Sequence, residues 1–177
     1  GLSWQWQLRG PIDTSVEADV FDVDLFDTPR ETIEELHALG RKVICYFNAG
    51  AYEPWRPDAA AFPSEVRGRP MDGWNEEWLD IRRIDLLAPV MRARLDLAAE
   101  KGCDAVEPDN VDGFINDAGF PLSYEDQRDY ALFLAGEAHQ RGLAVGLKNN
   151  LEQVPDLVDA FDFAVNEECY AWDECER

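Results

Sequence analysis

The stretch ETIEELHALGRKVICYF, residues 31–47, decides the fold. Its first half places apolar residues at helical spacing, and its second half is a short apolar run of the kind that forms a buried strand. Gly40 stands between the halves, where a helix C-terminus requires a left-handed residue, and the basic residues beside it suit the helix dipole. The stretch therefore predicts a helix that leads directly into a strand.

The same pattern occurs twice more, as MRARLDLAAEKGCDAVEP (91–108) and FLAGEAHQRGLAVGLKN (133–149), with Gly102 and Gly142 at the turns. Helix starts are marked as well. Thr28-Pro29-Arg30-Glu31 has the form of a capping box with proline at the first helical position, and Ser123 precedes the acidic start of another helix. Helices that alternate with strands predict βαβ units and a parallel sheet. We expect strands near 4–8, 20–26, 42–48, 105–110, 144–148 and 163–167, and helices near 29–39, 86–101, 124–141 and 151–159.

The ends of the predicted strands indicate which kind of α/β fold this is. No glycine-rich phosphate fingerprint follows any strand, so we expect neither a nucleotide-binding sheet nor a cofactor. Polar residues stand at the C-terminal ends of the strands instead, where a (β/α)8 (TIM) barrel has its active site. These residues are Gln7, Asp24, Asn48, Asp109, Lys148 and Glu167. A complete barrel has eight strands and typically at least about 200 residues. We therefore expect a single barrel domain over residues 1–177 that lacks the last two βα units.

Composition excludes several classes of partner. The chain has 177 residues, 46% of them hydrophobic, which is enough for a sizeable core. Acidic residues number 37 against 16 basic ones, giving a net charge of −21 that repels phosphate backbones and anionic lipid. No run approaches the roughly 18 apolar residues of a membrane helix. We expect no nucleic acid and no membrane partner. The charge would attract a cationic ligand, or would serve only to keep the protein in solution.

Four cysteines leave the covalent structure partly open. Cys169 and Cys175 lie close together in a polar segment, as an exposed disulfide would. Cys45 and Cys103 flank apolar runs, where they would either pair across neighbouring strands or remain buried thiols. Neither pair has the spacing of a zinc site. The acidic runs at 22–27 and 107–113 do not match the calcium-loop template, so no metal is expected.

Strand parity brings three charged residues together. Glu107 and Asp109 share one face of their strand, Lys148 ends the next strand, and Glu167 follows the strand after that. Two carboxylates on strands about 10 Å apart, leaning inward, would end about 5–9 Å apart, which is the range used by glycosidases. An acidic residue at a strand end often only caps the next helix. Two carboxylates and a lysine at one level favour a catalytic site.

The connection after the third strand, residues 49–85, is unusually long, and loops of this length in a compact domain are usually functional. It carries four aromatic residues, Tyr52, Trp55, Trp74 and Trp78. Exposed rings there would stack on the apolar faces of sugars. The alternative is that they pack the loop onto the rim of the barrel.

Several motifs resemble those of one enzyme family. They are WQWQLRGPID (4–13), DVDLFDT (22–28), VICYFNAGAYEPWRPDAAAFP (43–63), GCDAVEPDNVDGF (102–114), GFPLSYEDQ (119–127), GLKNN (146–150) and FDFAVNEECYAWDEC (161–175). The likeness is to glycoside hydrolase family 114, the endo-α-1,4-polygalactosaminidase-like (β/α)8-barrel proteins, and it runs through nearly the whole chain. It implies a secreted or extracellular enzyme that hydrolyses a partly deacetylated, α-1,4-linked galactosamine polysaccharide of the kind found in biofilm matrix.

The resemblance also implies functional residues. The two catalytic carboxylates of the family match Asp109 in EPDNVD and Glu167 in NEEC. We expect a retaining mechanism with Asp109 as nucleophile and Glu167 as acid and base, and the exchange of these roles is the nearest alternative. An acidic cleft would attract the ammonium groups of the polymer. The candidate substrate-binding residues are Gln7, Asp22, Asp24, Tyr46, Asn48, Trp74, Glu107, Lys148, Asn166 and Tyr170.

Two other functions fit the sequence less well. The chain would be a non-catalytic carbohydrate-binding or structural barrel if the missing strands were required for turnover. A sugar isomerase or aldolase would use Lys148 to form a Schiff base. That chemistry needs a desolvated, neutral lysine, and two nearby carboxylates would keep Lys148 protonated.

Overall fold

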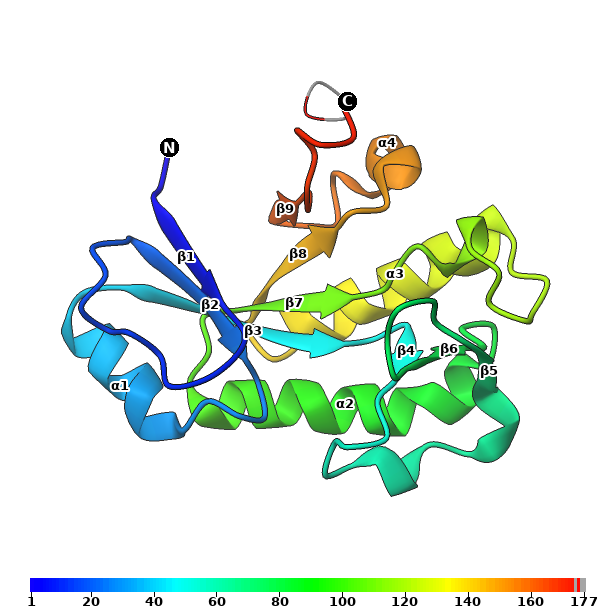
Figure 1. Cartoon of the computed structure of the whole chain (residues 1–177), viewed down its shortest axis with the longest axis horizontal. Coiled ribbons are helices and arrows are strands. Elements are labelled where there is room, and N and C mark those ends of the chain that lie inside the picture. The colour runs from blue at the N-terminus through cyan, green and yellow to red at the C-terminus, as the bar shows by residue number, and fades with distance from the viewer. Residues whose placement is uncertain (174, 176–177) are drawn as a thin grey trace.

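A computed structural model describes residues 1–173 and 175. Six parallel strands form a curled sheet in the order β1-β2-β3-β7-β8-β9, with β1 and β9 at its two edges (Figure 1). From β2 onward, a helix precedes each further strand of this sheet along the chain. The sheet is a half-barrel, which confirms the predicted α/β class and the incomplete (β/α)8 architecture.

The elements agree with the sequence-based ranges to within a few residues. The strands of the half-barrel are β1 (Trp4–Gln7), β2 (Val20–Asp24), β3 (Lys42–Asn48), β7 (Ala105–Asp109), β8 (Ala144–Lys148) and β9 (Phe163–Val165). The helices are α1 (Arg30–Ala38), α2 (Ile84–Lys101), α3 (Tyr124–His139) and the short α4 (Val154–Leu157). None of the described helices combines the length and apolarity that a membrane crossing requires.

The two faces of the sheet differ in what they bury. On the outer face, strand residues such as Phe21 and Val43 belong to one large core with Ile33 of α1, Met91 of α2 and Tyr130 of α3. The inner face has only a small apolar cluster at its base, formed by Val20, Ile44 and Ala105 with partly buried neighbours. Because side chains alternate along a strand, the remaining inward positions are left for polar residues.

Several helix ends follow local sequence signals. Ser123 forms a capping box with Asp126 at the start of α3. Gly102 and Gly142 have φ values of 88° and 73°, as helix-ending glycines require. The predicted capping box at Thr28 is wrong. Pro29 occupies the N-cap with an extended backbone and no side-chain cap, so α1 begins one residue later, at Arg30.

The long connection after β3 is an ordered insertion. It contains a three-stranded antiparallel sheet of order β4-β6-β5, formed by β4 (Ala51–Tyr52), β5 (Arg67–Pro70) and β6 (Glu77–Leu79). Arg56 ties the insertion to the barrel through two bonds to Asp24, of 2.9 and 2.6 Å. Gly50 lies so near Asn110 that a Cβ there would fall 1.7 Å from its carbonyl oxygen. Only glycine permits this approach.

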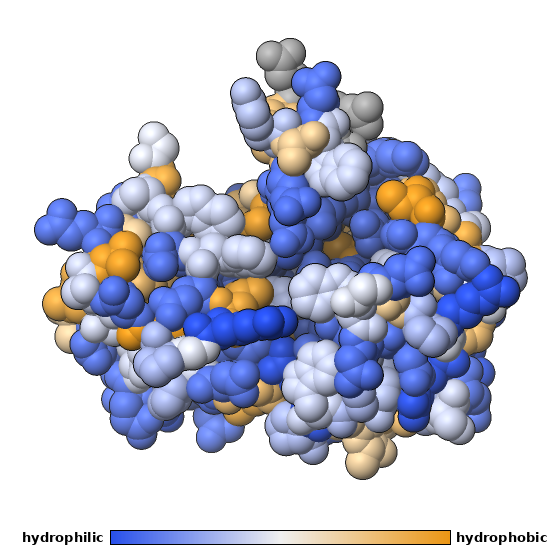
Figure 2. All heavy atoms as spheres, viewed as in Figure 1, coloured by the Kyte–Doolittle hydropathy of each residue, from blue (hydrophilic) through white to orange (hydrophobic). Residues whose placement is uncertain are grey.

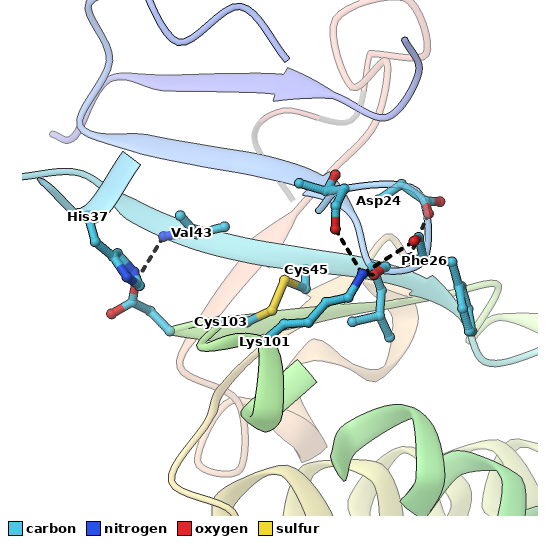
Figure 3. Close-up of a disulfide and its surroundings, with 10 residues drawn as sticks. Asp24, Phe26, His37, Val43, Cys45, Lys101 and Cys103 are labelled. Carbon is cyan, nitrogen blue, oxygen red and sulfur yellow. Dashed lines mark hydrogen bonds and ion pairs between the residues drawn. A yellow bond between two sulfur atoms is a disulfide. The ribbon is translucent and has the colours of Figure 1, made fainter. Parts of the chain in front are cut away.

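Two disulfides cross-link the chain. Cys45 of β3 pairs with Cys103, two residues before β7, which settles the choice that the sequence left open. Lys101 lies close beside this bond (Figure 3). Its Nζ donates to the carbonyl oxygens of Leu25 and Thr28, at 2.6 and 2.8 Å. Cys169 pairs with Cys175, as expected.

Removing each disulfide tests how much the loop that it closes contributes to stability. The Cys45–Cys103 bond closes a loop of 58 residues and the Cys169–Cys175 bond one of 6. Loop-closure entropy predicts that the double variant C45A/C103A loses about 4 kcal/mol of unfolding free energy and C169A/C175A about 2 kcal/mol. Denaturant titrations of both variants and the wild type measure the two losses. Equal losses would contradict the entropic account.

Candidate active site

Lys148 is the centre of a cluster of carboxylates at the C-terminal ends of the strands. Its side chain is only 1% exposed. The Nζ atom lies 2.5 Å from Glu107 Oε1, 3.4 Å from Asp109 Oδ1 and 3.8 Å from Glu167 Oε2. Strand parity predicted that Asp109, Lys148 and Glu167 would meet, and the structure brings them together.

The surroundings of Lys148 keep it charged. Burial alone would lower the pKa of its ammonium group, but the charges of Asp109 and Glu107 more than offset this effect and raise the pKa above its ordinary value. The rings of Trp6 and Tyr46 also face the ammonium, with centroids 5.2 and 5.6 Å away. A neutral, Schiff-base-forming Lys148 is therefore disfavoured.

Asp109 is held in one orientation by its neighbours. The Tyr46 hydroxyl donates to Oδ2 at 2.8 Å, and the Asn110 backbone N–H donates to Oδ1 at 2.8 Å. Asn110 has a left-handed backbone, with φ of 59°. The carbonyl oxygen of Asp109 accepts bonds from the N–H groups of Ala49 and Gly50, at 2.9 and 3.0 Å. Burial, together with the charge of Asp109, raises the pKa of Tyr46, so its hydroxyl remains a donor.

Glu167 is the more accessible carboxylate of the pair. Its side chain is 44% exposed, and its backbone N–H donates to Asn149 Oδ1 at 2.9 Å. Glu168, the next residue, has φ of 54°, a strained value for a residue with a long side chain. Because Glu167 and Asp109 both approach the Lys148 ammonium, their nearest oxygens are at most about 7 Å apart. This separation is compatible with a glycosidase pair.

A cleft of about 620 Å³ opens beside Glu167. The segments after β7, β8 and β9 supply its walls, and six of the lining residues are Asp112, Asn116, Asn149, Asn166, Glu167 and Trp172. Amide, carboxylate and indole groups of this kind bind sugars through hydrogen bonds and stacking. Burial, with the charge of Asp109, raises the pKa of Asp112 to about 6. Figure 2 shows that hydrophilic side chains dominate the face of the molecule in that view.

Glu76 is a further acidic residue that sequence reasoning missed. It lies in the connection between β5 and β6, is 9% exposed, and accepts a 2.8 Å bond from Asn48 Nδ2. Burial raises its pKa to about 7, and the nearby charges of Glu53 and Asp109 add to the effect. No motif marks this position, because the fold of the insertion alone brings Glu76 to the barrel.

The sequence matches the model of glycoside-hydrolase family GH114 over residues 1–177. The chain belongs to family GH114. The crystal structure of Aspergillus fumigatus Ega3 in complex with galactosamine is 44% identical, with a TM-score of 0.96 over 99% of this chain and 70% of that one. Membership makes this chain a glycoside hydrolase domain.

More distant structures share the fold of this GH114 chain. The glycoside hydrolase domain of PelA from Pseudomonas aeruginosa has a TM-score of 0.67 at 16% identity, over 93% of this chain and 66% of that one. A GH18 chitinase from Pseudoalteromonas aurantia has a TM-score of 0.56 at 14% identity, with the same two coverages. No protein with curated annotation has a significantly similar sequence.

Of four further residues predicted to bind substrate in this GH114 domain, Tyr46 and Asn166 lie at the site, and Trp74 and Tyr170 are exposed side chains whose role stays a prediction. Tyr46 is bonded to Asp109, and Asn166 lines the cleft beside Glu167. Trp74 is 59% exposed in the connection between β5 and β6. Tyr170 is 94% exposed beside the Cys169–Cys175 disulfide. The other aromatic residues of the insertion divide between the two expected roles, since Tyr52 and Trp78 are buried and Trp55 is exposed.

The placement of Gln7 in the barrel mouth is wrong. In the parallel register, Gln7 lies opposite Val23 of the outer core, whereas Trp6 lies opposite Asp22 on the inner face. The Gln7 amide bonds instead to Pro11 and Asp13 in the following turn. Trp6 is the residue of β1 that approaches Lys148.

Five other predicted substrate contacts are corrected by burial, among them Lys148, whose side chain is only 1% exposed. Asp24 is 4% exposed and paired with Arg56. Asn48 is fully buried, and its amide group bonds to Glu76 and to the Ala51 N–H. Asp22 and Glu107 have no exposed surface at all, so a substrate cannot touch them. For Glu107, strand parity predicted the correct face of the sheet but not the depth of burial.

No metal centre is evident in the part of the chain that the structure describes. Among residues 1–173 and 175, no three or more His, Cys, Asp or Glu side chains are arranged to hold an ion. The ammonium of Lys148 lies where the carboxylates converge.

The raised pKa of Glu76 predicts a pH-dependent stability. Between its ordinary pKa of 4.5 and its folded value of about 7, the folded protein binds more protons than the unfolded chain, so this group lowers stability as the pH rises. E76Q should flatten the decline in unfolding free energy between pH 5 and 7.

Denaturant titrations at both pH values measure the decline for E76Q and the wild type. The adjacent Glu77 is a matched control, because hydrogen bonding to Arg67 lowers its pKa and shifts its titration below this window. E77Q should therefore leave the decline unchanged. A wild-type slope in E76Q would contradict the prediction.

Proposed function

We propose that this GH114 domain hydrolyses an α-1,4-linked galactosamine polysaccharide, with Asp109 and Glu167 as its catalytic carboxylates. The observation that carries the proposal is the approach of both carboxylates to the single ammonium of Lys148. The galactosamine bound in the 44% identical Ega3 supports the choice of sugar. The proposal also specifies the polymer, its linkage, and which of Asp109 and Glu167 is the nucleophile and which the acid and base.

In the proposed mechanism, Asp109 attacks the anomeric carbon while Glu167 protonates the leaving glycosidic oxygen. Glu167 then removes a proton from the water that hydrolyses the glycosyl-enzyme. Fixed donors from Tyr46 and Asn110 aim the Asp109 carboxylate, and the exposure of Glu167 gives water access to it. The anomeric configuration of the first product, followed by NMR, distinguishes this retaining route from inversion.

The acidic charge of the domain suits a cationic polymer. Asp112 lines the cleft, and its burial disfavours the charged form of its carboxyl group. An ammonium group of the substrate would supply the missing opposite charge there. We propose that free amines of the polymer bind in this cleft.

We further propose that the working enzyme acts outside the cell and has a closed barrel. Two disulfides are typical of proteins in oxidising compartments. Two more βα units between β9 and β1 would pair the free edges of these strands and complete the eight-stranded sheet.

Amide substitutions test the catalytic pair. D109N and E167Q should each lower kcat by at least about 100-fold, because each removes a nucleophile or a proton-transfer group and keeps the size of the side chain. New reducing ends released from partly deacetylated galactosamine polysaccharide measure the rates. Circular dichroism and thermal unfolding check that the fold is retained.

D104N is the matched control for this pair. Asp104 precedes β7 at the opposite end of the barrel, where it bonds to His37 and Lys42. Its amide variant should keep wild-type activity. Activity near the wild-type level in both D109N and E167Q would refute the assignment. Polymer binding without cleavage by the wild type would favour a carbohydrate-binding domain.

The polymer's own charge tests the proposed substrate class. We expect kcat/KM to be at least about tenfold higher for free-amine than for fully N-acetylated oligosaccharides at low salt, because the acidic cleft attracts ammonium groups. Added salt should reduce this preference. D112N should reduce it as well, and D104N should not. An equal rate on both substrates, insensitive to salt, would contradict the proposal.

A further inference from the structure

Two carboxyl groups are buried together beneath the active site. Asp22 comes from β2 and Glu107 from β7, and both lie on the inner face of the half-barrel with no exposed surface. The ammonium of Lys148 bonds to Glu107 Oε1 at 2.5 Å. The mechanism does not use either acid directly.

Within the described part of the chain, three of their four oxygen atoms have no hydrogen-bond donor. These atoms are Asp22 Oδ1, Asp22 Oδ2 and Glu107 Oε2. Native proteins rarely leave buried polar atoms without a partner, and a buried charge without one is especially unfavourable. Two ionised carboxylates can only accept hydrogen bonds, so neither satisfies the other. One proton held between them would pair one Asp22 oxygen with Glu107 Oε2.

The local charges indicate that such a proton is present. Lys148 already faces three carboxylates, Glu107, Asp109 and Glu167. A charged Asp22 would be a fourth anion around one cation. Burial raises the pKa of Asp22 well above its ordinary value, and hydrogen bonding to Glu107 and the charge of Glu107 raise it further. The opposing effect of Lys148 is smaller.

The geometry also indicates which acid holds the proton. Glu107 accepts the short bond from the Lys148 ammonium, and a charge-assisted bond of this kind favours an ionised acceptor. Asp22 forms no salt bridge with any residue of the described chain. The proton therefore belongs on Asp22, with Glu107 Oε2 as its acceptor.

We propose that Asp22 is a permanently protonated positioning residue that donates a hydrogen bond to Glu107 and so fixes Lys148 between Asp109 and Glu167. Asp22 is not a substrate contact. It keeps Glu107 oriented and ionised, and Glu107 then holds the ammonium at the level of the two catalytic carboxylates. The proposal deepens the proposed function, on which its kinetic readout depends.

The amide variants of the two acids should differ sharply. Asparagine has the shape of a protonated aspartic acid, and its Nδ2 group donates to Glu107 as the acid does. D22N should therefore keep kcat within about threefold of the wild type, since the donor is retained. E107Q removes the charge that holds Lys148, so kcat should fall by about 100-fold with little change in KM. D22L, of similar shape but without a donor, should behave as E107Q does.

The kinetic test compares D22N, E107Q and D22L with the wild type on the galactosamine polysaccharide. Of the three variants, only D22N is expected to keep a kcat near that of the wild type. Losses in D22N as large as those in E107Q would overturn the proposal, as would wild-type activity in both E107Q and D22L.

A second measurement does not depend on activity. In protein labelled with ¹³C at aspartate carboxyl groups, the Asp22 signal, assigned by its absence in D22N, should remain at the protonated position at pH 7. An ionised Asp22 signal at pH 7 would overturn the proposal. If the wild type cleaves no galactosamine polymer, the proposed function fails, and this spectrum still decides the state of Asp22.

Discussion

One ammonium group among several carboxylates is the constraint on which this structure depends. Lys148 is almost fully buried, and it faces residues supplied by β7 and by the segment after β9. A lysine is removed from water in this way only where opposite charges compensate for the lost hydration. The sheet must therefore curl enough to bring these strands to one point, and the same curl creates the acidic mouth.

The sequence predicted the half-barrel and the central triad of Asp109, Lys148 and Glu167, because both follow from regular periodicity. The glycines between helices and strands indicated a parallel sheet. Alternation along each strand indicated which side chains share one face of that sheet. The depth of burial was not predictable from the sequence, because alternation along a strand does not distinguish buried Glu107 from the more accessible Asp109. Gln7 was assigned in place of Trp6 because a four-residue edge strand gives too few positions to fix its parity.

The insertion after β3 shows a different limit. Its strands have two to four residues and include glycine and proline, so they lack a readable period. Tertiary contacts shape it instead. Arg56 bonds to Asp24 and Glu53, and Arg94 bonds to Asp58 and to the carbonyl oxygen of Asn48. Basic side chains thus anchor the insertion, and Glu76 comes beside the barrel as a result.

The Cys45–Cys103 bond also has a topological effect. Together with the backbone between its ends it forms a covalent ring, and the whole insertion and all of α2 lie within that ring. Trp55 and Trp74 of the insertion are exposed, so a protease can reach the backbone there. A single cut there opens the ring without releasing a fragment, because the disulfide still joins β1, β2 and β3 to the segment that carries Asp109 and Glu167.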